Sequence, residues 1–145
     1  LCNASFFQPT ADSRLLLLVM SIEALIEPAF RSSDAKNHVE SLIEKTKSSS
    51  LPVEEQNSIL GSLRRLLRES INQAGKSLAN DRLGSRVYGD RNASEFFSYC
   101  YQLRSNLVHG NLQVPTFEEI GGVVATLEVF VSDLLTGPIL GYPAQ

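Results

Sequence analysis

A single run of apolar residues limits the possible folds of this chain more than any other feature. Between Pro52 and Leu78, apolar side chains recur every three or four residues, as on one face of an α-helix. They are Leu60, Leu63, Leu67, Ile71, Ala74 and Leu78. Pro52 precedes Glu54 and Glu55, and a proline in the first turn followed by acidic residues favours the start of a helix. The spacing predicts one long helix that packs against others in a bundle.

Four further segments are predicted to be helices, each bounded by residues that cap or break helices. They cover residues 13–27, 33–47, 93–109 and 117–136. Ser32 or Ser33 is the expected cap of helix 33–47, and Gly110 stops helix 93–109. Thr116 with Glu119 forms a capping box for helix 117–136. Residues 80–92 show no periodicity and are predicted to be a loop, and no alternating run predicts a strand. The expected fold class is therefore all-α, a bundle of four to five helices.

Length and composition fit one folded domain, since the chain has 145 residues, of which 43% are hydrophobic and 20% charged. We expect this helical domain to cover residues 13–136. Residues 1–12 are expected to be a lead-in or the tail of a preceding segment, and residues 137–145 a C-terminal tail. The first residue is Leu1 rather than methionine, which suggests a piece of a longer polypeptide or a lost start.

Charge and cysteine content restrict the partners and the compartment. A net charge of −3 argues against binding nucleic acid through the overall field, so a site for a polyanion would have to be a local patch. Cys2 and Cys100 are too few and too far apart for a disulfide framework, which favours a reducing compartment and a cytoplasmic location. The longest apolar run, Leu15 to Met20, is far shorter than the roughly 20 residues of a membrane span. No membrane partner is expected.

Residues that can carry chemistry gather at the end of helix 93–109. Histidine titrates near neutral pH and arginine stays charged, so Arg104 and His109 could together bind an anion and move a proton. At about 100° per residue the two lie about 140° apart around one helix, and they do not point the same way. A symmetric dimer that paired two such helices would place two arginines and two histidines around one cleft. Ser105 and Asn106 share the face of His109 and could support it.

A structural explanation competes with the chemical one. The dipole of a helix favours a histidine cation in its last turn, and a pattern as short as R-x4-H also arises by chance. By spacing alone, a helix-end histidine is the simpler interpretation.

The stretch 96–110, FFSYCYQLRSNLVHG, resembles the signature helix of the HEPN superfamily. Its Tyr-x-Leu-Arg-Ser-x-Leu-Val-His-Gly form is most similar to the Apea-like branch. The likeness extends to residues 21–25, SIEAL, in the first helix, and to the order and length of the long third helix and of the apolar final helix. It therefore covers most of the chain.

The resemblance implies a small helical bundle that dimerises through the motif helix. In many members of the family this is a metal-independent endoribonuclease, with roles in toxin-antitoxin or antiviral defence systems. The residues carried over as catalytic are Arg104 and His109, with Ser105 and Asn106 as supporting polar residues. In the family the residue after the arginine is often Asn, Asp or His, whereas this chain has Ser105 there. The partners implied are a second copy of the chain, RNA, and an antitoxin or fused domain.

Such chemistry needs no metal. RNA can be cleaved when its own 2′-OH attacks the neighbouring phosphate, which requires a base, an acid and a cation at the crowded phosphorus. Two copies of His109 could supply the acid and the base, and the planar fork of Arg104 suits the phosphate. The sequence has no HxxxH and no cysteine pair, so no metal site and no cofactor is assigned.

Three arginines before the motif helix could line a path for RNA, namely Arg82, Arg86 and Arg91. A run of charge is more often a solvated face.

Two other functions are open. The chain could be a non-catalytic HEPN-like module that dimerises and binds RNA, a nucleotide or a protein, which Ser105 and the acidic net charge favour and the intact Arg104 and His109 oppose. A HEPN partner modified on a tyrosine two places after the histidine is disfavoured, because that position is Asn111.

Overall fold

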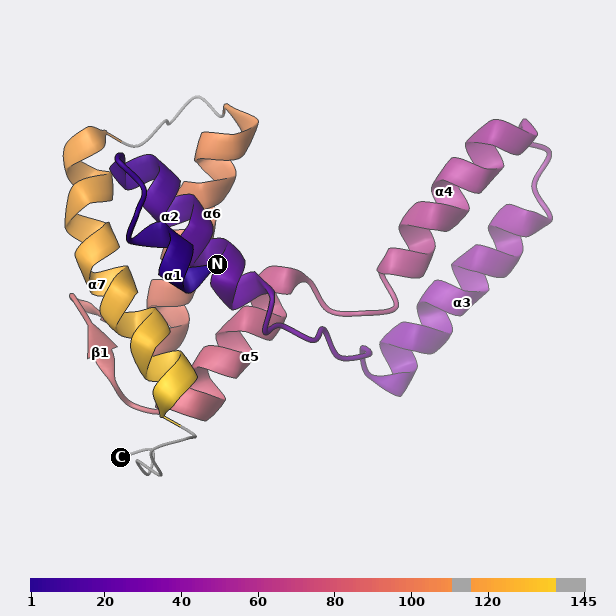
Figure 1. The fold of residues 1–145 in the computed structure, drawn as a ribbon. Coiled ribbons are helices and arrows are strands. Elements are labelled where there is room, and N and C mark those ends of the chain that lie inside the picture. Colours follow the sequence, from indigo (N-terminus) through magenta and orange to yellow (C-terminus); the bar gives the residue numbers. More distant parts are fainter. Residues whose placement is uncertain (111–115, 138–145) are drawn as a thin grey trace. The chain divides into compact units, whose positions relative to one another are not determined.

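The computed structural model describes residues 1–110 and 116–137 (Figure 1). In these ranges the chain forms seven helices and one short antiparallel hairpin, which confirms the all-α expectation. The elements are α1 (Cys2–Ser5), α2 (Ala11–Glu23), α3 (Ser33–Lys47), α4 (Val53–Arg65), α5 (Ile71–Leu83), β1 (Val87–Tyr88), β2 (Arg91–Asn92), α6 (Ala93–His109) and α7 (Phe117–Thr136). Asn111 lies outside the described residues. Of the C-terminal tail expected over residues 137–145, only Gly137 is described. None of the helices in the described ranges is both long and apolar enough to cross a membrane.

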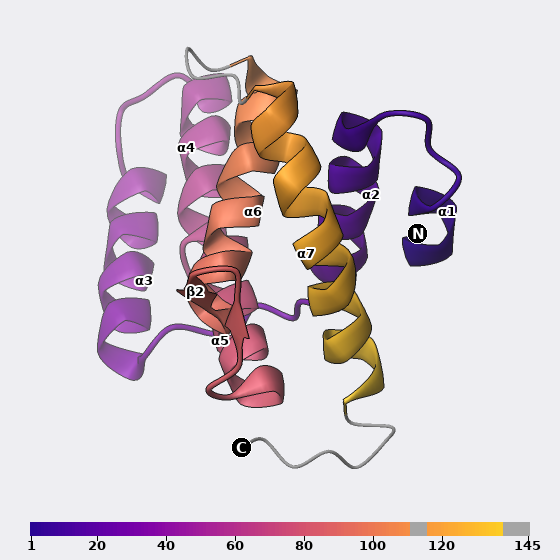
Figure 2. The same ribbon diagram turned by 90° about the vertical axis from the view of Figure 1, so that its left-hand side faces the viewer.

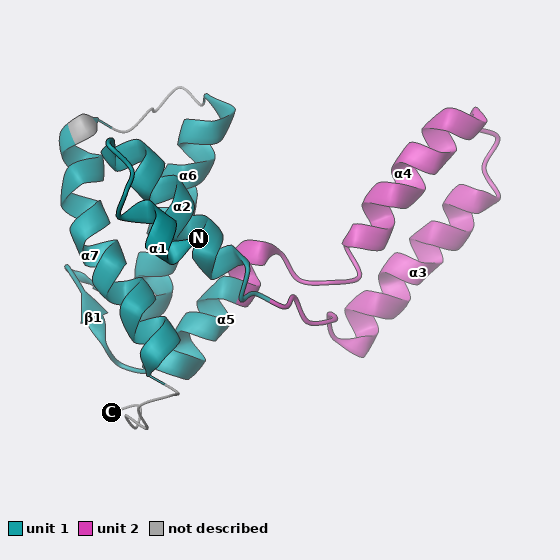
Figure 3. Ribbon diagram, in the orientation of Figure 1, with its two compact units in different colours: residues 1–26, 75–145 teal, residues 27–74 magenta. Residues whose placement is uncertain are grey.

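The chain divides into two compact units (Figure 3). Unit 2 is the continuous segment Glu27–Ala74, whereas unit 1 joins Leu1–Ile26 to the chain from Gly75 onward. The helical domain expected over residues 13–136 includes parts of both units. The segment expected as a lead-in, residues 1–12, contains α1 and the start of α2.

Unit 1 has a large apolar core. Helix α2 packs against both α6 and α7, and these three long helices lie side by side (Figure 2). Their apolar faces meet because each carries large side chains at helical spacing. Among those less than 2% exposed are Leu15, Leu18, Ile22, Phe97, Leu127 and Phe130. Tyr99 and Leu107, which the helical spacing also places toward the core, are half-buried.

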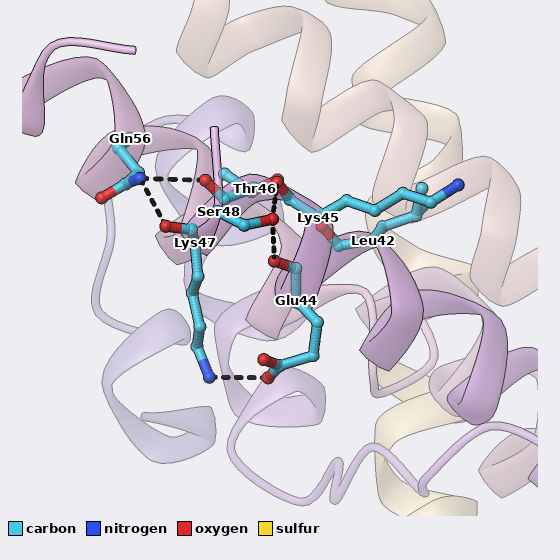
Figure 4. Close-up of polar contacts among 7 residues, drawn as sticks. All are labelled: Leu42, Glu44, Lys45, Thr46, Lys47, Ser48 and Gln56. Atoms are coloured by element: carbon cyan, nitrogen blue, oxygen red, sulfur yellow. Dashed lines mark hydrogen bonds and ion pairs between the residues drawn. The ribbon is translucent and has the colours of Figure 1, made fainter. Parts of the chain in front are cut away.

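Unit 2 is built on a helical hairpin of α3 and α4. Ser32 caps α3 by accepting a hydrogen bond from the backbone N–H of Ala35. At the turn, the Gln56 side chain donates to the carbonyls of Thr46 and Lys47, at 2.9 and 3.1 Å (Figure 4). The core between the helices is small: its buried residues are Val39, Ile43 and Leu60, with Leu63 and Leu67 packed beside them.

The prediction of one long helix from Pro52 to Leu78 is wrong, because α4 ends at Arg65 and a new helix begins at Ile71. The break pairs with the segment before α3: Arg31 donates its backbone N–H to the carbonyl of Leu67, and Glu69 donates to that of Ala29, both at 3.0 Å. These contacts between distant residues replace helical hydrogen bonds. Together with α1, the break raises the helix count from the expected four to five to seven.

Other boundaries follow their local signals. Helices α3, α6 and α7 have the predicted bounds, which confirms those three predictions. The first helix, predicted over residues 13–27, instead covers Ala11–Glu23, and its cap is Thr10, which accepts a hydrogen bond from the backbone N–H of Ser13. Helix α5 continues to Leu83, into the stretch predicted to be a loop, and the rest of that stretch contains the β1–β2 hairpin, with Gly89 at φ 66°.

Candidate functional site

Both ends of α6 are fixed by local signals, and these place the motif residues in its last two turns. Asn92 and Glu95 form a capping box at the start. Gly110 ends the helix in the left-handed conformation, with φ 60°, and its N–H donates to the carbonyl of Asn106. Phe97 and Cys100 are fully buried and hold the helix in the core of unit 1.

Arg104 faces helix α2. Its Nη2 lies 3.4 Å from Oε2 of Glu23, and the two side chains are 24% and 22% exposed. The Nε of Arg104 is buried and has no hydrogen-bond partner in the described part of the chain. The guanidinium therefore lies against a carboxylate, and its buried Nε–H is left without a partner among the described residues.

His109 occupies a different environment. It is the last residue of α6 and is exposed, and its imidazole makes no hydrogen bond or ion pair with any residue in the described ranges. The structure records no contact between His109 and Arg104 within one chain, as their angular separation on the helix leads one to expect. A site that used both would need groups from elsewhere, such as a second copy.

The two supporting residues are half-buried beside this end of the helix. Asn106 accepts a hydrogen bond at its side-chain Oδ1 from Nε2 of Gln102, one turn earlier, at 2.8 Å. Ser105 lies next to Arg104 in the chain. Part of the polar capacity near His109 is therefore already in use.

Each of the three arginines predicted to line an RNA path has a partner within unit 1. Arg82 donates to the carbonyl of Leu134 at 3.1 Å, and Arg86 lies 3.4 Å from the carboxylate of Asp133. Arg91 pairs with Asp90 and stacks 4.2 Å above the centre of the Tyr99 ring. The contact of Arg82 joins α5 to α7, whereas the charges of Arg86 and Arg91 are paired with carboxylates inside unit 1.

Two further ionisable groups near the motif helix have strongly shifted pKa values. Burial, followed by the hydrogen bond to Asp133, raises the pKa of Tyr88 to about 12. Burial also raises the pKa of the Cys100 thiol to about 12. Because the thiolate is the reactive form, Cys100 is a core residue rather than a nucleophile.

Glu23 is a residue near the candidate site to which sequence reasoning assigned no role. An acidic residue next to the apolar Ile22, within the SIEAL stretch, was the available signal. Its partner could not be deduced, because Arg104 is far away in the sequence.

Comparison with family models, curated proteins and solved structures finds no match to this chain. The described residues contain no group of His, Cys, Asp and Glu side chains that could hold a metal ion.

Proposed function

We propose that this chain is a HEPN-type, metal-independent endoribonuclease that uses Arg104 and His109 in a composite site at a homodimer interface. The observation that carries the proposal is the exposed imidazole of His109 at the end of a well-capped helix that also carries a half-buried arginine. A rigid helix end presents the imidazole to a partner or substrate at low entropic cost.

The roles follow from the chemistry of the groups. One His109 removes the proton of the attacking 2′-OH, and the second copy protonates the departing 5′ oxygen. Arg104 stabilises the negative charge that develops on the phosphoryl oxygens. Ser105 and Asn106 hold the imidazole or a ribose hydroxyl.

The ion pair between Arg104 and Glu23 favours a second candidate function. A carboxylate 3.4 Å from the guanidinium competes with a phosphate for the same donors. If the pair persists when RNA is added, the chain acts as a non-catalytic module that dimerises and binds RNA, a nucleotide or a protein.

The test is cleavage of a mixed RNA substrate in EDTA by the purified chain. We expect wild type to cleave and both His109→Ala and Arg104→Ala to lose at least about a hundredfold in rate, the order expected for loss of acid–base or charge stabilisation. His38→Ala and Arg65→Ala are matched controls, because both residues are exposed on unit 2. They should cleave like wild type.

Two results would reject the nuclease. One is a wild-type chain without cleavage, and the other is cleavage that survives both substitutions. Dilution tests the composite site: activity per chain should fall steeply once the dimer dissociates, whereas a site complete within one chain would keep it.

A further inference from the structure

The apolar surface of α4 is wider than its contact with α3 requires. Leu60 is buried against Val39 and Ile43, yet Ile59 and Leu66 remain 40% and 48% exposed. Leu66 is the C-cap of α4, in a helical conformation, and lies about two turns after Ile59, so the two form a row along one side of the helix. Leu63 lies between this row and the core.

Helix α3 has a matching row. Its residues, Ala35 and Leu42, are half-buried. At about 100° per residue, both lie to one side of the buried Val39 around the axis of α3. Ile59 is rotated from the buried Leu60 in the same sense around the axis of α4. Helices α3 and α4 run antiparallel (Figure 1). In an antiparallel pair, equal rotational senses place both rows on one side of the hairpin. We call this side the hairpin face; it consists of Ala35, Leu42, Ile59, Leu63 and Leu66.

The charges of α3 differ between this face and the opposite side. On the opposite side they pair with one another, Lys36 with Glu40 at 3.7 Å and Lys47 with Glu44 at 2.7 Å. Figure 4 shows Leu42 and Lys45 projecting to one side, away from the Glu44–Lys47 pair.

Asp34 and Lys45 flank the hairpin face, and neither of these exposed residues forms an ion pair within the described ranges. They lie about three turns apart on the same side of α3. One acid and one base are therefore left unpaired along the edge of an apolar surface.

We propose that the hairpin face binds the same face of a second copy, so that two hairpins form a four-helix bundle around a two-fold axis. An axis across the helices sets Asp34 of one copy level with Lys45 of the other, and the reverse. The midpoint of this pair lies next to Val39, and the midpoint between Ile59 and Leu66 lies next to Leu63. Val39 and Leu63 pack in the same cluster. A single two-fold axis can therefore pass through the midpoint of Asp34 and Lys45 on α3 and through the midpoint of Ile59 and Leu66 on α4.

The same axis brings Ile59 of one copy against Leu66 of the other. The exposed Ile59 and Leu66 of each copy are thereby buried, and four unpaired charges become two ion pairs. A self-complementary arrangement of this kind is what an isologous contact requires, which is why the occupant is a second copy rather than an unrelated protein. This contact is independent of α6 and of the proposed nuclease.

The test measures the mass of the full chain in solution by sedimentation or light scattering. We expect Asp34→Lys and Lys45→Asp each to weaken one association step on the order of tenfold or more, because each sets like charges against one another. An equimolar mixture of the two variants should regain it, since opposite charges then face each other. Lys47→Asp, with the same charge change on the opposite side of α3, should associate like wild type.

Any dimer formed through α6 persists in all these variants. The result to look for is therefore the loss of the association step through the hairpin face, seen as a lower mass than that of wild type, rather than one particular mass. A wild-type chain that stays monomeric at about 100 µM, variants that associate like wild type, or a mixture that fails to recover would each overturn the proposal. Crosslinking gives an independent check. In a Cys2→Ser background, Ile59→Cys mixed with Leu66→Cys should form a disulfide between chains, and its absence would contradict the register.

Discussion

Units 1 and 2 are both helical, but they bury apolar surface in different ways. In unit 1 the side chains of Phe97, Phe130 and Leu127 are fully buried between long helices. In unit 2 no buried core residue is less than 6% exposed, and apolar residues such as Ile59 remain at the surface. Since stability scales with the apolar surface removed from water, we expect unit 1 to be the more stable of the two. Four substitutions test this contrast, from the largest expected effect to the smallest.

The largest effect is expected from Phe97→Ala in unit 1. Removing a fully buried ring leaves a cavity and should lower the free energy of unfolding by about 3–5 kcal/mol. Urea denaturation followed by labelling of the buried thiol of Cys100 measures it, in a Cys2→Ser background. A loss below about 1 kcal/mol would mean that the core of unit 1 is not tightly packed.

Gly75→Ala should be the next most harmful. A Cβ at this position would overlap the ring of Phe97 at Cε1 and Cζ and would lie 2.9 Å from Cδ1 of Ile26. Overpacking of this kind costs about 1–3 kcal/mol, although alanine is the better helix former. The same denaturation experiment measures it; a more stable variant would show that the ring can move aside.

Tyr88→Phe should have a smaller effect. It removes the hydrogen bond that the phenol donates to Asp133 at 2.8 Å, and we expect a loss of about 0.5–1.5 kcal/mol at neutral pH. An unchanged stability would indicate that Arg86 satisfies Asp133 alone.

Wild type and Tyr88→Phe should also differ in how their stability depends on pH. Folding raises the pKa of Tyr88 from 10 to about 12, so the neutral phenol is favoured in the folded state. This contribution is present below pH 10 and is lost as the pH rises from about 10 through 12. Wild type should therefore lose stability over this range relative to Tyr88→Phe, as denaturation at successive pH values can show.

Gly61→Ala should have the smallest effect, and of opposite sign to that of Gly75→Ala. Nothing lies within 4 Å of a Cβ built at Gly61 in α4, so the substitution adds helix propensity without a clash. We expect unit 2 to gain up to about 1 kcal/mol. Amide hydrogen exchange in α4 is the measurement, and faster exchange would reveal a close contact at this glycine.

Sequence reasoning succeeded where a boundary is determined by neighbouring residues. The bounds of α6 follow from Asn92, Glu95 and Gly110, and those of α7 from the capping box at Thr116. It failed at the break after α4, because Leu67 and Ile71 keep the helical spacing across it. The hydrogen bonds that open the helix come from Ala29 and Arg31, which local spacing cannot reveal.

In the candidate site, too, only the features determined by neighbouring residues could be predicted from the sequence. The placement of Arg104 and His109 on different sides of α6 follows from the helical repeat alone. The approach of Glu23 to Arg104 depends on how α2 packs against α6, and no local pattern encodes it.

The discontinuity of unit 1 has a consequence for synthesis of the chain. Helix α2 is synthesised before the continuous segment Glu27–Ala74, and its packing partners α6 and α7 are synthesised after that segment. Until α6 and α7 have been synthesised, the apolar face of α2 lacks these packing partners and is exposed to chaperones and to neighbouring nascent chains. Unit 2 can therefore fold before unit 1 is complete, although it has the smaller core.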